Sequence, residues 1–243
     1  MKWANLRMSS HVVFRIKFPV WTGLLVLAAI CPGSVAMDCP PEPPRTNSEP
    51  GSVATDDAVT QERIQHVRKE SFPELKRVDL RTRSFHSRSD YFRTRFSLAR
   101  FFLPMKMRYY IDINPALFAQ QAPADGVCAI LAHELSHVSS LNRGNRLRRL
   151  SLVRLLSGGY TAKFERRTDL EAIHRGYGDG LKSYRTWVYA HIPPDKLSPK
   201  RRNYFSPEEI DAIQTQLHSH PGRFVYWSKH VPLNLQQVLG SPQ

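Results

Sequence analysis

The sequence has few cysteines, and it lacks an apolar run long enough to cross a membrane. Its 3 cysteines show none of the paired spacings that hold zinc in zinc fingers. The most apolar stretch, residues 20–30, is about half as long as the roughly 20 residues that a spanning helix needs, and Pro32-Gly33 follows it. The sequence also has no internal repeat. These absences disfavour a zinc-finger protein, a repeat protein and a membrane-spanning protein.

Residues 1–36 have the order of a secretory signal. Four basic residues and no acidic residue come first, the apolar stretch follows, and Ser34 and Ala36 are small. Small residues at these two positions are typical of signal cleavage, so we expect a cut after Ala36 and an exported protein, either periplasmic or secreted. The alternative is an uncleaved N-terminal segment that anchors the chain to a membrane.

The composition divides the rest of the chain into a linker and one domain. Residues 37–60 contain five prolines with Ser, Thr and Asp between them, which predicts a disordered linker. Residues 61–243 suit a single domain. Cys39 could pair with Cys128 in an oxidising compartment. The proline-rich surroundings of Cys39 nevertheless favour two unpaired cysteines, with Cys128 as a small buried apolar residue.

Acidic residues are scarce as well. Lys and Arg number 35 against 21 Asp and Glu, which gives a formal net charge of +14, and the chain remains strongly basic without residues 1–36. Such a balance favours anionic membrane surfaces, nucleic acid or acidic substrates. Because the arginines are scattered and an export signal is present, we expect no nucleic-acid partner. Peripheral contact with an anionic membrane surface stays open.

The hydrophobic pattern indicates an α+β fold. Alternating residues at 107–113 predict a strand, which Asn114-Pro115 ends, and residues 75–85 alternate more weakly. Helical spacing predicts a helix over residues 161–175, and a capping box at Ser206 opens another helix. We therefore expect a small N-terminal sheet followed by a mostly helical C-terminal part.

The pattern that carries chemistry is the run His133-Glu134-Leu135-Ser136-His137, inside the apolar segment 127–138. This segment predicts a buried helix. Two histidines four residues apart on a helix differ in direction by only about 40° and in height by about 6 Å, so both imidazoles can bind one metal ion. The spacing predicts a zinc site in which Glu134 acts as the catalytic base. The alternative is a surface helix that carries two histidines without a metal.

A catalytic zinc ion needs a third protein ligand. A third histidine in the pattern HExxHxxGxxH is excluded, since Ser140 and Arg143 occupy the glycine and histidine positions. Glu165 is favoured, because Asp169 lies one turn away, where its carboxylate can orient a ligand histidine. His174 is the main competitor, although it lies about 180° from Glu165 around a continuous helix. Alternatively, the two carboxylates belong to a solvated, arginine-paired helix face.

An HExxH motif followed by ExxxD resembles the gluzincin zinc metallopeptidases, in particular the group with the CAAX prenyl proteases and the bacterial heat-shock membrane protease. The resemblance covers about residues 105–180 and is specific at the motifs. It implies a zincin-like fold and a set of site residues, namely the zinc ligands His133, His137 and Glu165, the base Glu134 and the outer partner Asp169. The membrane members have several spanning helices, whereas this sequence implies a soluble, exported relative. The substrates of the membrane members therefore cannot be assigned to it.

These features together predict a zinc metalloendopeptidase that cleaves peptide or protein substrates with a zinc-activated water. The edge of a strand next to the active-site helix, at residues 107–113, could pair with an extended peptide. The candidate donors to the developing oxyanion are Tyr160, His174, Arg175 and Tyr177. A non-catalytic, zinc-stabilised binding or chaperone-like module at the membrane surface is the alternative, although such a site has no need of Glu134.

Overall fold

A computed structural model describes part of the chain, namely residues 39, 53–97, 99–100, 105–143 and 158–240. These residues belong to one compact unit, which spans residues 34–243. The predicted signal, residues 1–36, and the predicted linker up to residue 52, apart from Cys39, lie outside the described residues.

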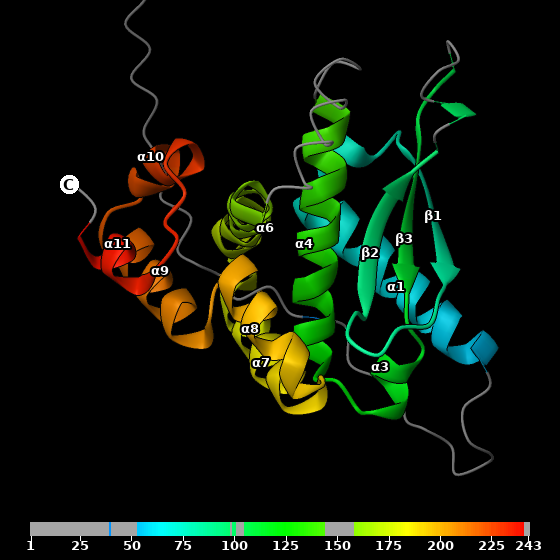
Figure 1. The fold of residues 1–243 in the computed structure, drawn as a ribbon. Coiled ribbons are helices and arrows are strands. Elements are labelled where there is room, and N and C mark those ends of the chain that lie inside the picture. Colours follow the sequence, from blue (N-terminus) through cyan, green and yellow to red (C-terminus); the bar gives the residue numbers. More distant parts are fainter. Residues whose placement is uncertain (1–38, 40–52, 98, 101–104, 144–157, 241–243) are drawn as a thin grey trace, which may run out of the picture. The chain divides into compact units, whose positions relative to one another are not determined.

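The described part is a mixed α+β structure that is mostly helical, as the sequence predicted (Figure 1). Its N-terminal half contains helix α1 (Val53–Ser71), a short 3₁₀ turn (Pro73–Leu75), strands β1 (Asp79–Ser84), β2 (Phe92–Phe96) and β3 (Arg108–Ile113), and helices α3 (Ala116–Ala119) and α4 (Ala124–Arg143). Its C-terminal half contains helices α6 (Gly158–Ala172), α7 (Gly178–His191), α8 (Pro194–Asn203), α9 (Pro207–Ser219), α10 (Arg223–Lys229) and α11 (Leu235–Leu239). None of the described helices has the length and apolarity needed to cross a membrane.

The three strands form one sheet in the order β1-β3-β2, in which β3 pairs parallel with β1 and antiparallel with β2. The predicted strand at residues 107–113 is confirmed as β3, but it lies in the centre of the sheet. The expectation that its edge is open to a peptide was therefore wrong, because backbone partners occupy both of its sides. The edge strand next to α4 is β2, which the sequence analysis did not predict.

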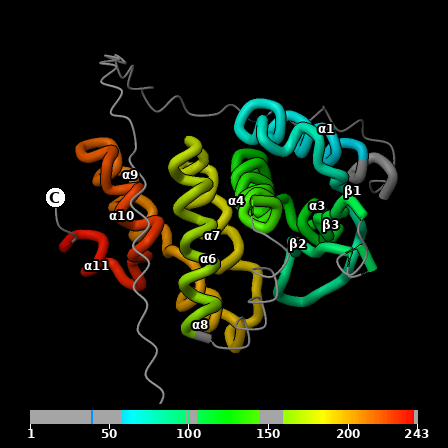
Figure 2. Tube along the Cα trace, turned by 90° about the horizontal axis from the view of Figure 1, so that it is seen from above, coloured from blue at the N-terminus to red at the C-terminus, as the bar shows by residue number. Residues whose placement is uncertain are grey.

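Helix α4 lies between the sheet and the helices α6 and α7, as the views in Figures 1 and 2 both show. It is buried on nearly all sides because apolar or small residues occupy most of its positions from Gly126 to Leu141. Helix α7 packs very closely against the first turn of α4. A side chain at Gly180 would begin 2.5 Å from the carbonyl oxygen of Asp125, so glycine is required there.

The predicted helix at residues 161–175 is confirmed, although it begins earlier than expected. Helix α6 starts at Gly158 and continues through one π-helical turn, Ile173–Tyr177. Gly176 takes a left-handed backbone conformation inside that turn, with φ of 91°, and the chain kinks there before α7 begins at Gly178. The glycines therefore end the helix, as the sequence predicted. The capping box at Ser206 is confirmed, since its hydroxyl accepts a hydrogen bond from the backbone of Glu209.

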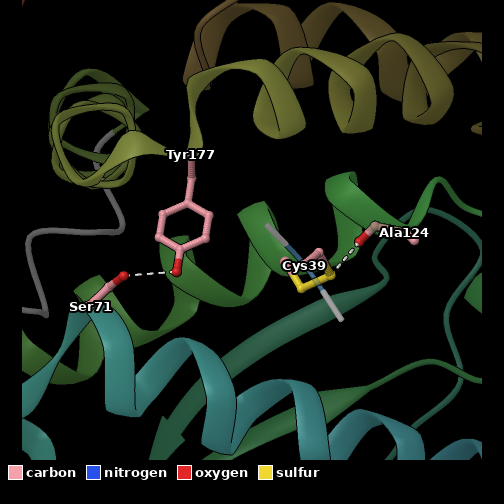
Figure 3. Close-up of a disulfide and its surroundings, with 5 residues drawn as sticks. Cys39, Ser71, Ala124 and Tyr177 are labelled. Carbon is pink, nitrogen blue, oxygen red and sulfur yellow. Dashed lines mark hydrogen bonds between the residues drawn. A yellow bond between two sulfur atoms is a disulfide. The ribbon is translucent and has the colours of Figure 1, made fainter. Parts of the chain in front are cut away.

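The N-terminal part of the domain differs from the expectation in two respects. Helix α1 begins at Val53, so residues 53–60 are helical although they were assigned to the linker. Cys39 forms a disulfide with Cys128 of α4, which corrects the expectation of two unpaired cysteines (Figure 3). The sequence separation of 89 residues between them leaves no local pattern from which the pairing could be predicted.

Candidate metal centre

Helix α4 positions two imidazoles for a shared ligand. His133 and His137 lie one helical turn apart on the side of α4 that faces α6, and their exposed fractions are only 2% and 7%. Their Nε2 atoms are 3.1 Å apart. Two imidazole nitrogens at this distance point at a common position, as the four-residue spacing predicted.

Helix α6 supplies the third group. The Oε2 atom of Glu165 lies 3.2 Å from Nε2 of His133 and 3.2 Å from Nε2 of His137. The three ligand atoms lie within 4.8 Å of one another, and this buried His-His-Glu group could hold a metal ion. The favoured third ligand therefore lies where the sequence analysis placed it.

Asp169 lies one turn further along α6 and orients His133. Its Oδ1 atom is 2.7 Å from Nδ1 of His133. The carboxylate also accepts hydrogen bonds from Arg185 at 2.8 Å and from the backbone N–H of Phe205 at 3.0 Å. Burial raises the pKa of Asp169, but Arg185 and His133 outweigh it and lower that pKa below its ordinary value. The ionised carboxylate can therefore accept a hydrogen bond from Nδ1–H of His133, which leaves Nε2 with a free electron pair.

Thr168 orients the second histidine in the same way, and the sequence analysis missed it. The Thr168 hydroxyl donates its proton to the carbonyl oxygen of Phe164 at 3.0 Å and lies 3.3 Å from Nδ1 of His137. Because that proton is already used, the hydroxyl oxygen accepts from the His137 ring. The Nε2 atom of His137 is then also left with a free electron pair.

The cluster attracts positive charge. Burial lowers the pKa of His133, but hydrogen bonds to Asp169 and Glu165 outweigh it and raise the pKa to about 9. Burial raises the pKa of Glu165, and the two histidines reverse this and lower it below its ordinary value. The three converging donor atoms repel one another unless a cation, a proton or a metal ion, lies among them. The donor set and its outer hydrogen bonds fit a metal ion.

Glu134 faces a cavity beside this cluster. The cavity has a volume of about 550 Å³, and Glu134, His137 and Glu165 all line it. The hydroxyl of Thr94, on β2, donates a hydrogen bond to Oε2 of Glu134 at 2.6 Å. The predicted base is therefore held at the cavity wall by the edge strand, with its second carboxylate oxygen available for another partner.

The other walls of the cavity are an apolar surface and the edge strand. All five residues of strand β2, Phe92 to Phe96, line the cavity, and Leu141 and Phe164 add apolar surface. Charged groups at the rim are Arg93, Arg95 and Lys200, which form ion pairs with Asp90 or Asp112. A cavity that borders a strand edge fits an extended chain.

Tyr204 is a further functional candidate that the sequence analysis missed. It follows α8, lines the cavity together with Glu134 and Glu165, and has its ring 5.9 Å from that of His133. The Arg185 guanidinium lies 4.2 Å above the Tyr204 ring and fixes its orientation. Burial and the nearby Glu165 carboxylate raise the pKa of Tyr204 well above its ordinary value. The hydroxyl therefore stays protonated and can donate a hydrogen bond.

The four candidate oxyanion donors do not line the cavity. The Tyr177 hydroxyl points to Ser71 of α1, at 2.8 Å (Figure 3), and Arg175 donates to Glu171 of its own helical segment. His174 stacks on Phe224, with ring centres 3.7 Å apart. Tyr160 lies near the start of α6, more than one turn before Glu165. Because His174 packs on Phe224 and is not part of the described His-His-Glu group, it is not a rival metal ligand.

No family model, no curated protein and no solved structure significantly matches this chain.

Proposed function

We propose that this protein is a zinc-dependent metalloendopeptidase with a zincin-like active site. The observation that carries the proposal is the convergence of His133, His137 and Glu165 beside a cavity whose wall holds Glu134. A purely structural zinc site is normally closed by four protein ligands, whereas a catalytic site has three and keeps one position open. Three donors and a neighbouring cavity support the catalytic arrangement.

The distances between the donor atoms favour zinc. A tetrahedral ion with bonds of about 2.0–2.1 Å has its ligand atoms roughly 3.3–3.4 Å apart. The three separations in this protein, 3.1, 3.2 and 3.2 Å, are close to that edge length. Imidazole nitrogen and carboxylate oxygen also suit zinc, whereas calcium and magnesium prefer oxygen ligands alone.

The residues of the cavity have separate tasks in this proposal. Bound zinc would polarise the scissile carbonyl group and lower the pKa of a water molecule. Glu134, held by Thr94, takes the proton from the attacking water and delivers it to the leaving amine. Tyr204 donates a hydrogen bond from its protonated hydroxyl to the developing oxyanion.

The substrate would bind along β2. Within the described sheet this strand pairs on one side, with β3, and its other side borders the cavity. An extended peptide can add to such an edge through backbone hydrogen bonds, which fixes its direction without demanding a particular sequence. The apolar surface of Phe96, Leu141 and Phe164 would favour a large apolar side chain.

Export after cleavage near Ala36 remains part of the proposal. The disulfide between Cys39 and Cys128 supports it, because such bonds persist mainly in oxidising compartments. The half-cystine at residue 39 lies close behind the proposed cleavage site, so the exported chain would keep it.

Metal removal tests the proposed function. The purified protein is expected to hold one zinc ion per chain by elemental analysis and to cleave members of a diverse peptide library. A chelator should abolish cleavage, and a stoichiometric amount of Zn²⁺ should restore it. A protein that is loaded with zinc but inert against the library would instead favour a non-catalytic, zinc-stabilised binding or chaperone-like module.

Replacing Tyr204 with phenylalanine tests the oxyanion donor. Loss of one such donor is expected to lower kcat by about 10²–10³-fold, with little change in KM, because the hydrogen bond forms mainly in the transition state. Tyr177→Phe is the matched control, since that hydroxyl contacts Ser71 outside the cavity. Equal kcat values in the two variants would show that Tyr204 has no such role.

A further inference from the structure

Exposed apolar side chains gather in one segment near the C-terminus. The described residues include six large apolar side chains that are exposed, and five of them lie between residues 225 and 239. They are Val225 at 59%, Tyr226 at 39%, Leu233 at 36%, Leu235 at 37% and Leu239 at 57%. Single exposed apolar residues are ordinary on a protein surface. A group of five within one short segment indicates a binding surface.

A basic hollow lies beside these apolar residues. It has a volume of about 440 Å³ and is formed by α6 and by the segment that contains α10 and α11. Lys163 and Arg167, one turn apart on α6, line one wall, and Lys229 and His230 line the other. Tyr226 and Leu233 belong both to this hollow and to the exposed apolar group.

The positive charge of the hollow is not neutralised within the described part of the chain. No Asp or Glu lines the hollow, and none of its three Lys and Arg side chains forms an ion pair with a described residue. Elsewhere on the surface, basic residues such as Arg93, Arg108 and Lys182 do pair with carboxylates. The hollow therefore brings three Lys and Arg side chains together with no carboxylate in its lining.

The hollow faces away from the metal centre. Lys163 and Arg167 each lie two residues from Glu165, which corresponds to about 200° around the helix. Glu165 points toward α4, so the two basic side chains are on the opposite face of α6. Figures 1 and 2 show α10 and α11 on the side of α6 that is remote from the sheet. A ligand in the hollow would leave the cavity along β2 open.

We propose that this C-terminal face, which comprises the hollow and the exposed apolar residues Tyr226 and Leu233 that line it, binds an anionic membrane surface. Phosphate groups of the lipids occupy the basic hollow, and the apolar side chains enter the boundary between headgroups and acyl chains. A small soluble anion would use the charge but not the apolar residues. The combination of both on one face is typical of interfacial binding.

Vesicle sedimentation tests the proposal with the full, metal-loaded protein. Wild type is expected to sediment with phosphatidylcholine vesicles that contain 30 mol% phosphatidylglycerol, and not with pure phosphatidylcholine vesicles. The variant Lys163→Gln/Arg167→Gln/Lys229→Gln should bind on the order of 100-fold more weakly, at about 1 kcal/mol per basic residue near the surface. The variant Tyr226→Ser/Leu233→Ser, with the charges intact, should also bind more weakly.

The matched control removes three basic side chains from the sheet side of the molecule, as Lys76→Gln/Arg77→Gln/Lys106→Gln. These residues are exposed and lie far from the hollow in sequence, and the control should keep wild-type binding. Equal losses in the two triple variants would overturn the proposal, because any positive charge would then suffice. Displacement by 10 mM inorganic phosphate would show a site for a soluble anion instead. A dimer that the serine variant dissociates would show that a second copy covers the face.

Cleavage of a soluble peptide separates this inference from the proposed function. The triple variant of the hollow is expected to keep wild-type hydrolysis, because none of its three residues lines the cavity with Glu134. Vesicle binding should likewise survive removal of the metal. Failure of either proposal therefore leaves the other standing.

Discussion

Replacing Glu134 with glutamine is expected to lower the rate of peptide hydrolysis by about 10²–10⁴-fold, the usual contribution of a general base. Glutamine has the same shape and can still accept the hydrogen bond from Thr94, so the wall of the cavity is preserved. It cannot take a proton from water at neutral pH. Zinc should stay bound, since Glu134 is not among the three converging donors. Steady-state kinetics beside elemental analysis measure the two effects separately.

The control for this substitution is Glu62→Gln, which removes one negative charge from an exposed position on α1. Its kinetics should equal those of wild type. If Glu134→Gln hydrolyses peptides at the wild-type rate with zinc bound, Glu134 is not the base. If the variant instead loses zinc, the carboxylate acts as a ligand, and the assignment of Glu165 has to be revised.

Replacing Glu165 with alanine should remove both zinc and activity. The substitution deletes one of three donor atoms, and its effect on zinc affinity should exceed the 10–100-fold that the loss of an outer hydrogen-bond partner typically costs. The purified variant is expected to contain little zinc and to show no hydrolysis at micromolar zinc. Glu165 is partly exposed, with 16% of its side chain accessible, so the variant should still fold.

Glu171→Ala is the matched control, because it makes the same change on the same helix. The Glu171 carboxylate contacts Arg175 and lies outside the ligand set. This control should keep its zinc and its activity. Full zinc occupancy in Glu165→Ala would contradict the proposed metal centre, whereas loss of zinc in both variants would point to a general disturbance of α6. Circular dichroism spectra of the two variants distinguish these outcomes.

The sequence predicted those residues of the site that lie one turn apart on the same helix. His133 and His137 share a face because of their four-residue spacing, and Glu165 and Asp169 do so for the same reason. The two pairs come together because α6 packs against α4. Helical periodicity therefore determines these positions, and the sequence was sufficient to predict them.

The parts that the sequence did not predict depend on contacts between distant segments. Thr94 reaches Glu134 across 40 residues, and Tyr204 enters the cavity from a short connection between α8 and α9. Neither residue belongs to a recognisable sequence motif. Strand β2 was overlooked for a related reason. Its arginines, Arg93 and Arg95, resemble a solvated basic surface, although the less exposed residues at positions 92, 94 and 96 alternate with them as in a strand.

Helix α4 carries both a half-cystine of the disulfide and the two histidines of the candidate metal centre. The disulfide closes a covalent ring of the chain that contains α1 and the whole sheet, with a sequence separation of 89 between the two cysteines. By chain entropy such a closure stabilises the folded state by about 4–5 kcal/mol. The histidines five and nine positions further along belong to the next stretch of chain, where a metal ion would fasten them to α6. One helix thus joins an N-terminal half that the disulfide closes into a ring to a C-terminal half that a bound metal ion would fasten to it.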